Sequence, residues 1–332
     1  MEYKKFTLDD LDNIEVTEGV LLPAYFEVLK ETIESYGNLK SFINKHYNIK
    51  KWLIISDYAL DNYNKQGNFL TFTLMPCYMP INNLMGNIRK MQTKDIKKTK
   101  LINDDFIDFL AQPFFFHVSI ELPYKRERLV KFGKDYFILL YTWLSDITSD
   151  KILKAQCKYF IEKLKRSPKL PLHTDIDFIS CVVSLLQLQI FKHIPDTEVI
   201  CWLSDRDDVL TTLGQKTKDK ILPMIFNLIN YRSQIFFNFL NLPLNKRQIP
   251  FLSFGLPETH GRMWYDSLIR IPDFIAGSLA DNNKKEMRVT KKIFQEVLER
   301  VVSNKDHNLI IRLNIDENTV NFIKTIYELK IN

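Results

Sequence analysis

Glycine is scarce in this chain, with only 9 among 332 residues. The sequence contains no glycine-rich phosphate loop, no HExxH and no GxSxG motif. The shortage disfavours a loop-rich β protein and a glycine-loop nucleotide binder. The missing motifs leave P-loop hydrolases, HExxH metalloproteases and serine hydrolases of the nucleophile-elbow type without support.

Cysteine is also sparse and gives no sign of a disulfide framework. The four cysteines are far apart, show no CxxC spacing and have no paired histidines: Cys77, Cys157, Cys181 and Cys201. Most of them lie in apolar runs, where a free cysteine usually acts as a small buried hydrophobe. The first 15 residues are acidic and lack the apolar segment of a secretory signal. We therefore expect free thiols in a reducing, cytoplasmic setting.

Long apolar runs are missing as well. A membrane helix needs roughly 18 or more apolar residues, and the closest candidates, 178–191 and 235–244, are too short or carry polar residues. The sequence therefore predicts no membrane span. The net charge of +6 permits nucleic-acid binding without demonstrating it.

What is present is material for a large core, since 45% of the residues are hydrophobic, including 24 Phe and 14 Tyr. We find no internal repeat and no low-complexity linker, and we expect one domain over 1–332. Continuous or alternating apolar runs predict strands at 51–56, 68–75, 113–122, 199–204, 249–254 and 308–313. Helices are predicted at 23–46, 216–240, 271–280, 285–302 and 317–329, with a helical insertion at about 125–195. This alternation indicates a layered α/β fold, and the shortness of the runs leaves an all-α fold as the alternative.

Two aspartates follow separate buried strands directly. Asp57 comes after KWLIIS, and Asp205 comes after VICWLS. Catalytic groups of α/β proteins tend to lie at strand ends, where the loops leave room for a ligand. The competing interpretation is that each is an ordinary turn or N-cap residue.

A third aspartate, Asp273, lies in IPDFIAGSLA. Pro272 suits the first position of a helix, which would place Asp273 in the first turn. Asp273 then shares a helix face with Ala276, Gly277 and Ala280, which are small enough to let the helix approach a sheet closely. Asp273 would point inward on that face, or it would simply favour the positive end of the helix.

Inward carboxylates from separate elements repel one another unless a cation joins them. Mg²⁺ and Mn²⁺ prefer oxygen ligands, and two such ions can clamp the attacking and leaving oxygens of a phosphodiester. The sequence shows that each aspartate lies where such convergence is possible.

In order along the chain, these features resemble the RNase H-like superfamily. The chain is most similar to a bacterial branch of uncharacterised proteins in which the first strand ends in an Asp-rich turn and the last helix reads like "laDliaga". The local matches are LIISDYALD (53–61), DIKKTKL (95–101), VICWLSDRDD (199–208) and IPDFIAGSLA (271–280).

The resemblance implies an RNase H-like mixed sheet flanked by helices, with acidic metal ligands. These would be Asp57, Asp205 and Asp273, with Asp95 as the fourth carboxylate and Glu121 as its rival. Lys97 and Lys98 would lie near a substrate phosphate.

The function implied is a nuclease or phosphoryl-transfer enzyme that uses Mg²⁺ or Mn²⁺ on DNA or RNA, with water as the nucleophile. The first turn reads Asp57-Tyr58-Ala59-Leu60, where the family has Asp-x-Ser-Gly. The alternative is therefore an inactive scaffold that binds a partner protein or nucleic acid. A helical interaction protein is the third possibility, and the oligomeric state is left open.

Three further polar residues, His173, Asp175 and Asp177, form HTDID. We expect them to be the cap and first turn of a helix rather than a metal site.

Overall fold

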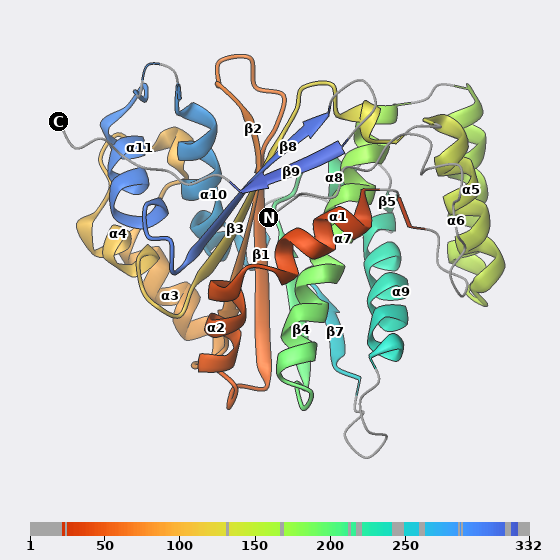
Figure 1. Ribbon diagram of the computed structural model, residues 1–332, viewed down its shortest axis with the longest axis horizontal. Coiled ribbons are helices and arrows are strands. Elements are labelled where there is room, and N and C mark those ends of the chain that lie inside the picture. Colours follow the sequence, from red (N-terminus) through yellow and green to blue (C-terminus); the bar gives the residue numbers. More distant parts are fainter. Residues whose placement is uncertain are drawn as a thin grey trace.

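The computed structural model (Figure 1) describes residues 22–23, 25–130, 133–166, 169–211, 214–216, 221–240, 249–258, 263–284, 286, 288–315 and 320–324. Within them the chain forms an α/β structure in which a seven-stranded mixed sheet separates two helical layers. The prediction of a layered α/β fold is confirmed, and the all-α alternative is wrong.

The sheet has the strand order β7-β4-β1-β2-β3-β8-β9. Its strands are β1 (Lys51–Ala59), β2 (Asn68–Pro76), β3 (Phe116–Leu122), β4 (Val199–Ser204), β7 (Phe251–Phe254), β8 (Asn308–Ile315) and β9 (Val320–Lys324). β1, β2 and β3 form an antiparallel meander, and β4 and β7 extend it from β1 in parallel. On the other side, β8 is parallel to β3 and β9 is antiparallel to β8. A separate hairpin joins β5 (Gly214–Lys216) to β6 (Ile221–Pro223).

The central strands are buried on both faces. β1 is buried continuously from Trp52 to Asp57, which explains its unbroken apolar run. Because successive side chains point to opposite faces, Ile54 enters one hydrophobic core and Ile55 enters the other. The sheet therefore separates two hydrophobic cores.

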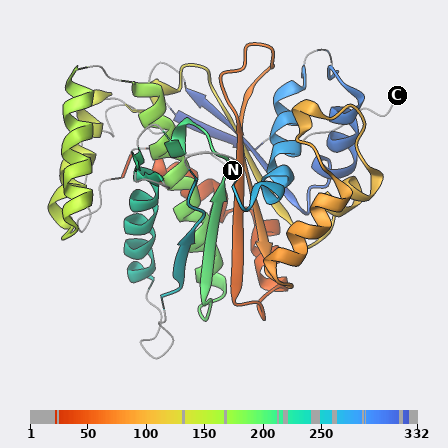
Figure 2. The same ribbon diagram turned by 180° about the vertical axis from the view of Figure 1, so that it is seen from behind.

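Helices cover each face of the sheet (Figures 1 and 2). The first core holds residues of α1 (Phe26–Glu34), α2 (Gly37–Lys45), α7 (Leu170–His193) and α9 (Met224–Phe239). The second holds residues of α3 (Ile81–Met91), α4 (Asp104–Leu110), α10 (Asp266–Asp281) and α11 (Lys292–Val297), which a π-helical turn, Leu298–Val302, continues. A hairpin of α5 (Lys134–Ile147) and α6 (Lys151–Arg166) stands at the outer edge of the first layer. Short helical segments are η3 (Ile96–Lys98), η4 (Arg126–Leu129) and α8 (Asp208–Thr211).

Helix α7 bears on the expectation that the chain has no membrane span. It has 24 residues, and its length and apolar composition would suffice to cross a membrane, although no run of that kind was predicted. Its polar residues interrupt the apolar run without lowering the mean hydropathy below that of a membrane helix. The apolar 18-residue window of this helix is buried inside the protein. A core helix has this same profile, so α7 is only weak evidence for a membrane span.

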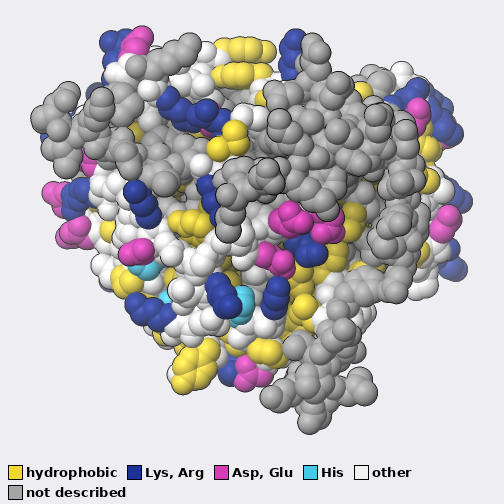
Figure 3. All heavy atoms as spheres, viewed as in Figure 1, with side chains coloured by type: hydrophobic (Ala, Val, Ile, Leu, Met, Phe, Trp, Pro, Cys, Tyr) yellow, Lys and Arg dark blue, Asp and Glu magenta, His cyan; other side chains and the backbone are white. Residues whose placement is uncertain are grey.

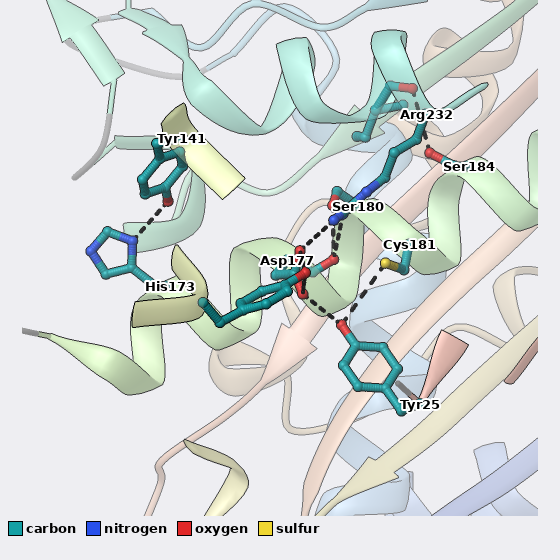
Figure 4. A network of polar contacts seen from close by, with 10 residues as sticks. Tyr25, Tyr141, His173, Asp177, Ser180, Cys181, Ser184 and Arg232 are labelled. Atoms are coloured by element: carbon teal, nitrogen blue, oxygen red, sulfur yellow. Dashed lines mark hydrogen bonds and ion pairs between the residues drawn. The ribbon is translucent and has the colours of Figure 1, made fainter. Parts of the chain in front are cut away.

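The polar residues of α7 are buried and pair with side chains of other elements, and they do not cap the start of the helix (Figure 4). The helix begins at Leu170, so Asp177 lies well inside it and the prediction of a first turn was wrong. The Asp177 carboxylate accepts hydrogen bonds from Tyr25 at 2.9 Å and Tyr136 at 3.2 Å, and it pairs with Arg232 of α9 at 2.5 Å. Asp175 pairs in the same way with Arg126 of η4. These two ion pairs connect α7 to its neighbours.

We expect Arg232→Met to lower the free energy of unfolding by about 3–5 kcal/mol, because it leaves the Asp177 charge buried without its cation. Arg232 is completely buried. Lys192→Met removes the exposed pair with Glu34 and is the matched control, with a loss of about 1 kcal/mol or less. Urea denaturation measures both. Equal losses in the two variants would contradict a stabilising role for the buried pair.

Other departures from the predicted elements have local causes. The helix predicted over 23–46 is divided at Ser35 and Tyr36 into α1 and α2. The helix predicted over 285–302 begins only at Lys292. A helix was predicted over 317–329, but the described part, Val320–Lys324, is the edge strand β9. Its backbone pairing with β8 overrides the local helical pattern.

All four cysteines are free, as predicted, and Cys157 and Cys181 are buried. On the face shown in Figure 3, basic and acidic side chains are interspersed. This pattern fits a chain whose 46 basic and 40 acidic residues nearly balance.

Candidate metal centre

Asp57 lies inside β1 rather than after it, because antiparallel pairing with β2 continues to Ala59. It shares the strand face of Leu53 and Ile55, which belong to the core beneath α10. Asp57 is only 8% exposed. No described residue donates a hydrogen bond to its carboxylate. A buried carboxylate without a donor is costly unless a cation or a proton neutralises it.

Asp205 follows the last residue of β4, as predicted. Its backbone N–H donates to the carbonyl of Ser56 at 3.2 Å, which anchors Asp205 beside Asp57 on the neighbouring parallel strand. One of its carboxylate oxygens accepts from the N–H of Arg206 at 2.7 Å. The carboxyl ends of β1 and β4 therefore bring two aspartates to the same edge of the sheet.

Asp273 comes from above the sheet, on α10, which packs on β1 and β2. The helix begins at Asp266, so Pro272 and Asp273 lie in its interior and the predicted first-turn position was wrong. The predicted inward face is nevertheless present. Asp273 Oδ2 accepts from the backbone N–H of Ile96 at 3.0 Å, and a Cβ on Gly277 would lie 3.1 Å from the Ile96 side chain. The small residues thus let η3 approach the helix.

The carboxylates perturb one another strongly. Burial raises the pKa of Asp57 well above its usual range, and the carboxylates of Asp273, Asp205 and Asp207 raise it further. Burial likewise raises the pKa of Asp273 to about 7, opposed by the Ile96 N–H and assisted by Asp95 and Asp205. These shifts indicate that the acidic groups share one electrostatic neighbourhood.

Asp207 belongs to this neighbourhood, although the sequence analysis did not select it from the cluster DRDD. Burial raises its pKa to about 7, and Asp205 adds to the shift. Its Oδ1 accepts from the N–H groups of Val209 at 2.9 Å and Leu210 at 3.3 Å, so Asp207 also caps α8. In the sequence, the signal for Asp207 was its position two residues after Asp205, just beyond the end of a predicted strand.

The two candidates for a further carboxylate differ in their surroundings. Asp95 is 56% exposed, lies 3.7 Å from Arg270 of α10, and acts on Asp273. Glu121 pairs with Lys284 and, at 2.8 Å, with Arg312. Glu121 is therefore already neutralised by two cations, whereas Asp95 lies next to the acidic neighbourhood.

The two predicted substrate lysines also differ. The Lys97 ammonium lowers the pKa of both Asp57 and Asp273, so it lies near them. Lys98 is exposed, and no contact within the described ranges joins its side chain to a carboxylate. Only Lys97 is thus brought to the acidic neighbourhood.

Among the residues that the structure describes, no group of three or more His, Cys, Asp or Glu side chains is gathered closely enough to hold one metal ion. Asp205, Asp207 and Asp273 each have one oxygen held by a backbone N–H. The carboxylates are neighbours, but they do not form a closed ligand set.

No known protein family, curated protein or solved structure matches this chain significantly.

Proposed function

We propose that this protein is a divalent-metal-dependent nuclease, or a related phosphoryl-transfer enzyme, with an RNase H-like fold. The sheet supports the fold assignment. β3-β2-β1 is an antiparallel meander and β4 and β7 continue it in parallel, so the sheet is mixed, as the resemblance implies, with β1 and β4 side by side. The helix that follows these strands, α10, returns to cover β1 with an aspartate facing it.

The observation that carries the proposal is the state of Asp57. Its carboxylate is nearly buried, lacks a hydrogen-bond donor among the described residues, and is surrounded by three further acidic groups. The Lys97 ammonium lowers the pKa of Asp57. Several carboxylates facing one ammonium leave an excess of negative charge that hard divalent cations suit. Their oxygen donors are the kind that Mg²⁺ and Mn²⁺ prefer, although the described carboxylates do not close around one ion in this structure.

Asp57, Asp205 and Asp273 are the residues that would hold the ions, with Asp95 or Asp207 at the margin. Divalent ions at such a site supply charge neutralisation for the phosphodiester oxygens and activation of water. The chain itself orients the carboxylates through the N–H groups of Arg206 and Ile96. Lys97 offers an exposed positive charge to a substrate phosphate beside them.

The test is cleavage of DNA and RNA oligonucleotides by purified protein with Mg²⁺ or Mn²⁺ and with EDTA. We expect cleavage only with metal. Absence of cleavage with either metal would overturn the enzymatic proposal.

A second candidate is a binding scaffold that has lost the reaction. The lack of a closed ligand group among the described residues favours it, as does the unusual turn after Asp57. It predicts binding of nucleic acid that weakens steeply with salt, without metal-dependent cleavage.

A further inference from the structure

Trp264 differs from the other tryptophans of this chain in its exposure. Trp52 and Trp202 are fully buried and Trp143 is partly buried, whereas 46% of Trp264 is exposed. A single exposed aromatic residue is ordinary in itself. Trp264 is distinguished by the residues that surround it.

Trp264 has one aromatic contact and one backbone contact. Trp264 meets Tyr265 edge-on, with ring centroids 5.2 Å apart and planes at 83°, and its carbonyl accepts from Arg89 Nη2 at 3.4 Å. Tyr265 is fully buried, and its hydroxyl donates to the carbonyl of Gly255 at 3.1 Å. An edge-on contact leaves at least one indole face unoccupied by Tyr265. The indole ring therefore has an accessible face.

The residue after Trp264, Tyr265, connects this segment to β4. Gly255 donates its N–H to Trp202 of β4 at 2.9 Å, and a Cβ on Gly255 would collide with Tyr265 and with Leu203. Leu203 lies two residues before Asp205. The ring of Tyr265, the residue after Trp264, is thus packed near the end of the strand that precedes Asp205.

Two cations connect to Trp264 and to the carboxylates, respectively. Arg89 of α3 contacts the Trp264 backbone, and Lys97 of η3 acts on Asp57 and Asp273. Both α3 and η3 pack against α10. Arg89 and Lys97 therefore lie on two consecutive elements that both contact α10, the helix that carries Asp273.

We propose that Trp264 is a base-stacking platform that makes this site select single-stranded nucleic acid; the proposal rests on the nucleic-acid function proposed above. In a duplex, each base face is covered by its neighbours, so a base must leave the stack before it can lie on the indole. In a single strand, an unpaired base stacks on Trp264 while its phosphates contact Arg89 and Lys97.

The experiment measures binding in EDTA, where cleavage cannot occur, by fluorescence anisotropy of labelled dT and rU oligomers and of a hairpin duplex. We expect wild type to bind single strands more tightly than the duplex. Trp264→Ala should weaken single-strand binding by about 5- to 150-fold, the equivalent of about 1–3 kcal/mol per stacked base. Trp264→Phe should retain most of the affinity, and duplex binding should change little.

Tyr47→Ala is the matched control. Tyr47 is 61% exposed and lies just before the start of β1, whereas Asp57 lies near the end of that strand. Quenching of tryptophan fluorescence by unlabelled oligomer in wild type gives a readout that needs no variant. Unchanged affinity in Trp264→Ala, equal losses on single strand and duplex, or no single-strand binding by wild type would each overturn the proposal. Binding that depends on Trp264, without any cleavage, would exclude the proposed nuclease function and leave the proposed stacking role intact. Cleavage by wild type, together with unchanged binding by Trp264→Ala, would exclude the stacking role and leave the proposed nuclease function intact.

Discussion

Asp57→Asn abolishes metal-dependent cleavage, with an expected loss of about 1000-fold or more, equivalent to about 4 kcal/mol of transition-state stabilisation. Asparagine keeps the size of the side chain but removes the charge that a divalent cation requires. Asp57 is the expected centre of the site because Asp273, Asp205 and Asp207 all act on its pKa. The measurement is the initial rate of oligonucleotide cleavage at saturating Mg²⁺.

The matched control is Asp196→Asn. Asp196 is exposed, pairs with Lys50, and precedes β4 at the opposite end of the strand from Asp205. This variant should cleave at the wild-type rate. Asp57→Asn is expected to fold, since it removes a charge that burial already disfavours. Cleavage by folded Asp57→Asn at the wild-type rate would exclude Asp57 as a metal ligand.

Asp273→Asn stabilises the metal-free protein at alkaline pH. The folded-state pKa of Asp273 is raised from 3.8 to about 7, so the folded state holds this proton more tightly than the unfolded state. The contribution of Asp273 to stability is complete below about pH 4 and is lost as the pH rises to about 7. At pH 8 the variant should be about 1–2 kcal/mol more stable, a value reduced for partial solvent access to the group. Asparagine can still accept the Ile96 N–H.

Urea denaturation in EDTA at pH 4, pH 6 and pH 8 measures this effect as a difference between variant and wild type. Other titrating groups, such as His117, whose pKa burial lowers to about 3, cancel in that difference. The advantage of the variant should grow from pH 4 to pH 8. A variant that is less stable than wild type at every pH would show that the Asp273 carboxylate is not electrostatically strained.

The strands were predictable from the sequence where the signal was local. The run VICWLS predicted a strand over 199–204, and β4 has these bounds. The run KWLIIS predicted the start of β1 but not its end, because the last three residues are strand only through pairing with β2. β9 could not be predicted for the same reason, since its conformation depends on β8.

The candidate site was predictable one residue at a time, but not as a group. Positions after buried strands pointed to Asp57 and Asp205, and small residues on one helix face pointed to Asp273. Asp207 was missed because the same residue serves as a helix cap, which is the ordinary role of an aspartate in a turn. The difference between Lys97 and Lys98 depends on how η3 packs on α10, and adjacent lysines carry no such information in the sequence.

Diffraction from crystals grown with Mn²⁺, measured for its anomalous signal, tests the central claim most directly. If the carboxylates of β1, β4 and α10 hold a divalent cation, the map shows a peak within about 2.0–2.6 Å of an Asp57 oxygen and of an oxygen from Asp205 or Asp273. No peak at Asp57 under saturating Mn²⁺, or peaks only at other sites, would contradict the account.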